Sequence, residues 1–146
     1  VTELVTGVDI VREQLRIASG KALSFQVTDC YLRGHAVEVR LYAEDPRSFL
    51  PQAGRLERLR LPAGIRVDSG VREGDEIGTA YDPMIAKLIA AGATREEAFD
   101  RLSSALRETE VGGVTTNLPF LRWLATHPLV RTGDRVPREH HARALR

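Results

Sequence analysis

The chain has 146 residues, of which 42% are hydrophobic and 28% are charged, a composition typical of one soluble globular domain. Its 21 basic and 20 acidic residues leave a formal charge of +1, so nothing in the charge favours a nucleic-acid or membrane partner. No apolar run reaches the roughly 20 residues of a membrane-spanning helix. The single cysteine cannot form an internal disulfide, which is typical of a reducing compartment and predicts a cytoplasmic location. Because the sequence opens on Val1, we expect it to be a piece of a longer protein.

The first predicted element is an amphipathic helix over residues 8–19. Thr6 followed three positions later by Asp9 resembles a capping box, and Gly20 is typical of a helix end. The apolar stripe of this helix consists of Val8, Val11, Leu15 and Ala18.

Residues 35–44 alternate between apolar and polar side chains, which predicts a half-buried strand. The apolar face consists of Val37, Val39, Leu41 and Ala43, and the polar face of Glu38, Arg40, Tyr42 and Glu44. From residue 51 to residue 89, glycines and prolines separate short apolar runs. This spacing predicts several short antiparallel strands that form a small sheet or a partial barrel.

Two further helices are predicted in the last third of the chain. The first covers residues 95–109 and begins at a capping box formed by Thr94 and Glu97. The second begins at Asn117, a residue type typical of helix N-caps, and ends before His127-Pro128.

The sequence predicts no metal site. The four histidines are scattered or terminal, and the lone cysteine has no cysteine partner, whereas zinc needs a cluster of such ligands. Cys30 also lacks a neighbouring base, which argues against a nucleophilic role.

Glu38 and Arg40 are the first candidate for chemistry. Their two-residue spacing on a strand puts both side chains on one face. A carboxylate beside a guanidinium can hold it in place and aim its remaining donors at an anion. The alternative is a surface ion pair that contributes little to stability.

The second candidate is the stretch from Tyr81 to Lys87, which combines an aromatic ring, an acid and a lysine just after the glycine-rich turns. Loops on a rigid scaffold commonly carry site residues. The alternative is a tight turn at Asp82-Pro83, followed by apolar core residues.

Taken in order, these and other segments resemble one family, the biotin carboxylases. The resemblance covers about residues 1–130. The matching motifs are Gly7-Val8-Asp9-Ile10-Val11, Arg33-Gly34-His35-Ala36-Val37-Glu38-Val39-Arg40, Ala43-Glu44-Asp45-Pro46, Phe49-Leu50-Pro51, Tyr81-Asp82-Pro83-Met84-Ile85-Ala86-Lys87-Leu88 and Gly112-Gly113-Val114-Thr115-Thr116-Asn117.

The resemblance implies the carboxyl-terminal lobe of an ATP-grasp ligase that serves an acyl-CoA carboxylase. Such enzymes activate bicarbonate with ATP and Mg²⁺ or Mn²⁺ as carboxyphosphate, and then carboxylate N1 of biotin held on a carrier. The implied fold is α/β (α+β): an antiparallel sheet with flanking helices, part of which resembles a barrel-sandwich hybrid. We expect this domain over residues 1–131 and a polar tail over residues 132–146.

The resemblance also implies roles for individual residues. Arg40 matches the arginine that contacts the biotin ureido oxygen, Glu38 would orient it, and Tyr81 and Asp82 would line the biotin approach. Val111 would form an apolar wall near the adenine. Lys87 and Asn117 are assigned to structure.

The family's ATP-binding, metal-binding and bicarbonate-binding residues and its catalytic base belong upstream, so we expect the chain alone to be inactive. The expected partners are the upstream ATP-grasp lobe, the biotin carrier domain and a carboxyltransferase subunit. A second copy is also an expected partner, with contacts in the Gly64–Arg72 region. Two alternatives remain open: a structural or dimerisation module without site residues, and a biotin carrier modified at Lys87.

Overall fold

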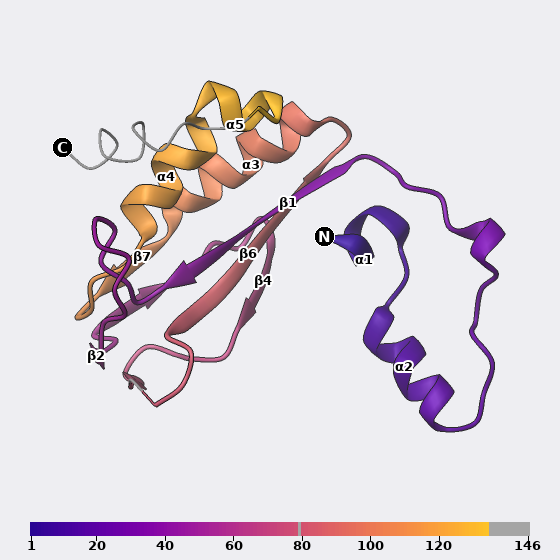
Figure 1. The fold of residues 1–146 in the computed structure, drawn as a ribbon, viewed down its shortest axis with the longest axis horizontal. Coiled ribbons are helices and arrows are strands. Elements are labelled where there is room, and N and C mark those ends of the chain that lie inside the picture. Colours follow the sequence, from indigo (N-terminus) through magenta and orange to yellow (C-terminus); the bar gives the residue numbers. More distant parts are fainter. Residues whose placement is uncertain (79, 135–146) are drawn as a thin grey trace.

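A three-stranded antiparallel sheet forms the centre of the computed structural model, which describes residues 1–78 and 80–134 (Figure 1). Its strand order is β1 (His35–Tyr42), β6 (Met84–Gly92) and β4 (Arg66–Ser69). Two smaller sheets pair β2 (Gly54–Arg55) with β5 (Glu76–Ile77), and β3 (Arg58–Arg60) with β7 (Glu110–Gly112). The predicted short antiparallel strands are confirmed, but in the described residues they form three separate sheets and do not close into a barrel.

Three helices lie together on one side of the sheet: α3 (Arg95–Glu108), α4 (Leu118–Thr126) and α5 (Pro128–Thr132). Helix α3 contacts β6 and β1, and α4 packs against α3. The apolar face of β1 points into this layer, as the alternation predicts, and Leu41 is fully buried. The core between sheet and helices includes Leu41, Ala86, Leu88, Ala90, Leu102, Leu106, Leu118 and Leu121.

Helix α3 begins where the capping box predicts. The Thr94 hydroxyl accepts a hydrogen bond from the Glu97 amide at 3.2 Å. The Glu97 carboxylate accepts a hydrogen bond at 2.7 Å from the amide of Ala93, one residue before the N-cap. Helix α4 ends at Thr126 as expected, but α5 follows at once and extends into the predicted tail as far as Thr132, and residues 135–146 lie outside the described part.

The amino-terminal segment differs from the prediction of one helix. Two short helices, α1 (Thr2–Thr6) and α2 (Ile10–Ala18), are separated at Gly7, which has a left-handed φ of 74°. Asp9 rather than Thr6 is the N-cap of α2, because its side chain accepts from the Arg12 amide. The apolar stripe of α2 is exposed: Val11 is 60% exposed and Leu15 67%. The helix lies to the side of the sheet and away from α3 and α4 (Figure 1).

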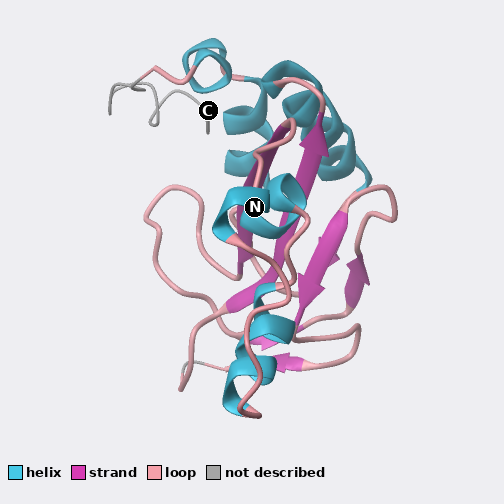
Figure 2. Ribbon diagram, turned by 90° about the vertical axis from the view of Figure 1, so that its right-hand side faces the viewer, coloured by secondary structure: helices cyan, strands magenta, loops and turns pink. Residues whose placement is uncertain are grey.

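A few polar contacts attach this segment to the rest of the fold. Glu3 pairs with Arg66 of β4, and this ion pair lowers the pKa of the Glu3 carboxyl. The Arg33 amide donates to the Val5 carbonyl at 2.8 Å. Buried Glu13 accepts from the amide and hydroxyl of Ser24, which ties α2 to the loop that leads to the 3₁₀ turn Val27–Asp29. Figure 2 shows α1 in front of the sheet.

None of the helices in the described part has both the length and the apolarity that crossing a bilayer requires.

Gly34 allows the start of β1 to lie close against the end of β6. Its φ is 67°, and a Cβ at this position would lie 2.4 Å from the Gly92 carbonyl oxygen. Gly20 has a similar φ of 77°, but nothing lies within 4 Å of its Cβ position. Both glycines therefore adopt a conformation that L-residues avoid, and only Gly34 also lacks the space for a side chain.

We predict that Gly34→Ala lowers the free energy of unfolding more than Gly20→Ala does. The left-handed conformation alone costs an L-residue about 1–2 kcal/mol, which both variants bear. The steric overlap at Gly34 adds about 1–3 kcal/mol, the cost typical of overpacking. Urea unfolding followed by circular dichroism measures both values, and equal losses would contradict the steric argument.

Candidate functional site

Glu38 and Arg40 lie side by side on the face of β1 that points away from α3 and α4. The Arg40 Nε lies 3.6 Å from Glu38 Oε1, as the two-residue spacing predicts. The Arg40 side chain is 57% exposed, whereas that of Glu38 is 26% exposed. The carboxylate therefore restrains one side of the guanidinium, and the Arg40 side chain remains more than half exposed.

The side chains on this face keep Arg40 positively charged. The interaction with Tyr42, and less strongly that with Glu38, raises the pKa of the Arg40 guanidinium above its ordinary value. Because the pair is partly exposed, it contributes little to folding stability. Its effect is on the position and charge of the guanidinium.

Asn117 holds the backbone of β1 at the position of Arg40. The Asn117 Nδ2 donates to the Arg40 carbonyl at 3.1 Å, and its Oδ1 accepts from the Tyr42 amide at 3.0 Å. The Asn117 amide also donates to the Tyr42 carbonyl at 3.1 Å. Asn117 is the N-cap of α4 as predicted, but its side chain makes no capping bond. It forms hydrogen bonds to the backbone of the edge strand β1 instead.

We predict that Asn117→Ala lowers the free energy of unfolding by about 2–4 kcal/mol, because it leaves an amide and a carbonyl of β1 without partners. Thr115→Ala, at an exposed position two residues earlier, is the matched control and should change it by less than about 0.5 kcal/mol. Chemical unfolding of both variants measures the difference. An Asn117 variant as stable as the control would show that the two side-chain bonds do not hold β1.

The loop that carries Tyr81 and Asp82 lies beside the end of β1. The Ala43 amide donates to the Pro83 carbonyl at 2.9 Å, which fixes this loop next to the strand that bears Arg40. The Asp82 carboxylate accepts from the Met84 amide at 3.0 Å, so it forms the expected turn. Tyr81 is 90% exposed. Both residues therefore lie in a loop that is attached to the chain just after β1.

Val111 and Lys87 do not lie in the loop that carries Tyr81 and Asp82. Val111 belongs to β7, pairs with Leu59 of β3 and packs against the core, in a sheet separate from β1. Lys87 lies in the middle of the central strand β6, directly opposite Arg40. Sequence periodicity could not reveal this neighbour, because it depends on which strands pair and in what register.

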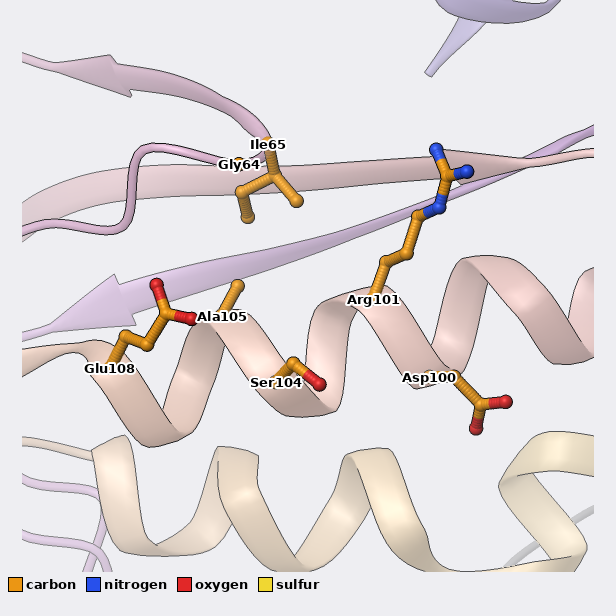
Figure 3. A pocket seen from close by; sticks show the side chains of 7 residues that line it. All are labelled: Gly64, Ile65, Asp100, Arg101, Ser104, Ala105 and Glu108. Carbon is orange, nitrogen blue, oxygen red and sulfur yellow. The ribbon is translucent and has the colours of Figure 1, made fainter.

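Within residues 1–78 and 80–134, no three His, Cys, Asp or Glu side chains lie close enough to hold a metal ion. A hollow of about 320 Å³ lies between α3 and the loop that precedes β4 (Figure 3). Ile65, Arg101 and Glu108 are among its lining residues, and it lies apart from Arg40.

Comparison with known proteins shows the family to which the chain belongs. Residues 38–137 match the family model described as the biotin carboxylase C-terminal domain. The chain belongs to the biotin carboxylase family. It is 45% identical over 136 residues to the biotin carboxylase of Halalkalibacterium halodurans, a match that covers 92% of this chain and 30% of that one. It is 50% identical over 122 residues to the biotin carboxylase of Haemophilus influenzae, covering 82% of this chain and 27% of the relative.

The solved biotin carboxylases have the same fold. The biotin carboxylase domain of a thermophilic 2-oxoglutarate carboxylase bound to bicarbonate superposes with a TM-score of 0.94 at 41% identity. That match covers 99% of this chain and 34% of the other. The Hydrogenobacter thermophilus domain, described as a dimer with MgADP, ADP and bicarbonate, gives a TM-score of 0.93 at 41% identity, with 99% and 33% covered. The chain therefore spans about a third or less of these biotin carboxylases.

Proposed function

We propose that this C-terminal domain forms the biotin-facing side of an ATP-dependent biotin carboxylase, with Arg40 bound to the biotin ureido oxygen. The observation that carries the proposal is the guanidinium itself. It is exposed, permanently charged and restrained by Glu38, and Asn117 fixes its backbone. A rigid cation of this kind suits an oxygen on which negative charge develops.

The chemistry gives Arg40 a defined task. When N1 of biotin loses its proton, the electron pair delocalises onto the ureido oxygen. N1 then forms a bond to the carboxyl carbon, and the bond from that carbon to phosphate breaks. A guanidinium already in position stabilises the charged ureido oxygen without rearrangement, which lowers the barrier to deprotonation.

The base, the ATP site and the Mg²⁺ or Mn²⁺ site belong to the remainder of the parent protein in this proposal. The upstream ATP-grasp lobe would cover the exposed α2 face. Of the twelve large hydrophobic side chains exposed in the described part, nine lie within residues 1–32. Such a cluster is typical of an interface. We therefore expect the isolated chain to be inactive as a ligase.

Arg40→Met in the full-length enzyme tests the proposal. Losing one donor to a developing oxyanion typically costs about 10²–10³-fold in rate, so biotin carboxylation should fall by that factor. ATP turnover with bicarbonate alone should survive. Arg47→Met, at an arginine in the loop after β1, should change neither rate. If Arg40→Met also leaves carboxylation unchanged, the domain is a structural module without site residues.

Tyr81 and Asp82 border the approach of biotin in this proposal, and Val111 forms an apolar wall near the adenine of ATP. A biotin carrier domain would deliver the substrate, and a carboxyltransferase subunit would take the carboxyl group onward to an acyl-CoA. The other candidate, a carrier modified at Lys87, has no support in the geometry. That lysine lies mid-strand, whereas a carrier lysine stands at a hairpin tip.

We further propose that the domain pairs with a second copy through the Gly64–Arg72 region and the adjacent hollow on α3 (Figure 3). Ile65 supplies an apolar centre, and the lining residues Asp100, Arg101 and Glu108 supply both signs of charge. A surface with both signs can match itself across a two-fold axis.

Ile65→Glu should weaken this dimer by at least about 100-fold in Kd, because it buries an unpaired charge at the centre of the contact. Leu50→Glu, on an exposed loop residue elsewhere, is the control and should leave the dimer intact. Sedimentation equilibrium of the full-length enzyme measures both. A dimer of Ile65→Glu as tight as that of the control would refute this interface.

A further inference from the structure

Lys87 occupies a defined position in the row of side chains that crosses the sheet at Arg40. It pairs in register with Arg40 on β1 and with Asp68 on β4. Residues directly opposite each other in an antiparallel pair share a face and lie about 5 Å apart at Cβ. Lys87 is therefore the immediate neighbour of Arg40 on the face of the sheet that points away from α3 and α4.

Asp68, the acid on the other side of Lys87, already forms an ion pair with Arg66. The Asp68 carboxylate accepts a hydrogen bond from Arg66 Nε at 3.1 Å, and Arg66 also pairs with Glu3. On the other flank, the Glu38 carboxylate pairs with Arg40. Lys87 is a half-buried residue, and in the part of the chain that the structure describes its ammonium forms no hydrogen bond or ion pair.

This arrangement is unfavourable for a purely structural lysine. Like charges directly opposite in a sheet repel each other. The two nearby carboxylates that could offset the repulsion are each paired with an arginine. An anion bound between Arg40 and Lys87 would remove the repulsion. The residue type is also notable, since only Lys21 and Lys87 among the 21 basic residues are lysines.

We infer that Lys87 binds the carboxylate that is transferred to biotin, next to the ureido oxygen that Arg40 holds. This inference rests on the proposed function. The carboxyl group on N1 and the ureido oxygen are attached to neighbouring ring atoms, so two cations on adjacent strands fit them together. The ammonium is a compact charge that suits a carboxylate oxygen, and the planar fork of Arg40 suits the ureido oxygen. In this role Lys87 makes an ionic contact only.

Three variants of the full-length enzyme test this role: Lys87→Met, Lys87→Arg and Lys21→Met. Met keeps the apolar stem and removes the charge, Arg keeps the charge, and Lys21 is an exposed lysine in the loop after α2. The readouts are kcat for biotin carboxylation, KM for biotin, the number of biotins carboxylated per ATP hydrolysed, and the thermal midpoint.

For Lys87→Met we expect kcat for carboxylation and the carboxylation yield per ATP to fall by a factor on the order of 10–100. The thermal midpoint should stay equal to that of Lys21→Met, and Lys87→Arg should recover part of the loss. A purely structural lysine would instead lower the midpoint and leave the yield per ATP unchanged.

Three results would overturn the inference: an unchanged yield per ATP, an equal loss in Lys21→Met, or a fall in bicarbonate-dependent ATP turnover as large as the fall in carboxylation. The last result would place Lys87 at the carboxyphosphate-forming step. Arg40→Met in the same assay separates the two proposals. A loss with Arg40→Met but not with Lys87→Met overturns only the role of Lys87, whereas no loss with either overturns the proposed function.

Discussion

The antiparallel pairing of β1 with β6 is the interaction on which the rest of this domain depends. It places alternate side chains of β1 in two different environments. Leu41 and its apolar neighbours meet α3 and α4, while Glu38 and Arg40 face the open side. Because side chains alternate with a period of two, a slip of one residue would bury Arg40 and expose Leu41. The core and the candidate site therefore require the same register.

Two residues outside the pairing hold β1 at its two ends. Gly34 lets the chain pass close to Gly92 at the start of the strand, where no side chain fits. Asn117 bonds to the backbone of Arg40 and Tyr42 near the other end. These constraints place the Arg40 backbone before any substrate binds, and Glu38 then restrains its side chain. Catalytic charge stabilisation depends on this kind of preorganisation.

Much of the architecture follows from local sequence signals. The alternation around Arg40 predicts β1 and its buried face, and the Thr94 capping box predicts the start of α3. These elements are predictable because each pattern carries its own physical cause. The amino-terminal helix is predicted less well, because Gly7 interrupts it and its apolar stripe, including Leu15, has no partner within the described chain.

The candidate site is only half visible in the sequence. The spacing of Glu38 and Arg40 reveals their common face, but neither Asn117 nor Lys87 is near them in the chain. The sequence predicts Asn117 as an ordinary helix cap, and only the fold shows that its side-chain amide hydrogen-bonds to β1 instead. The position of Lys87 depends on strand pairing across more than 40 residues, which no local pattern encodes.

A crystal structure of the full-length enzyme with biotin and bicarbonate bound would test the central claim most directly. We predict an Arg40 guanidinium nitrogen within hydrogen-bond distance of the ureido oxygen, about 2.7–3.2 Å. The β1 backbone and the hydrogen bonds of Asn117 should remain unchanged. Biotin bound elsewhere, with the Arg40 guanidinium still exposed to solvent, would contradict the proposed role of Arg40.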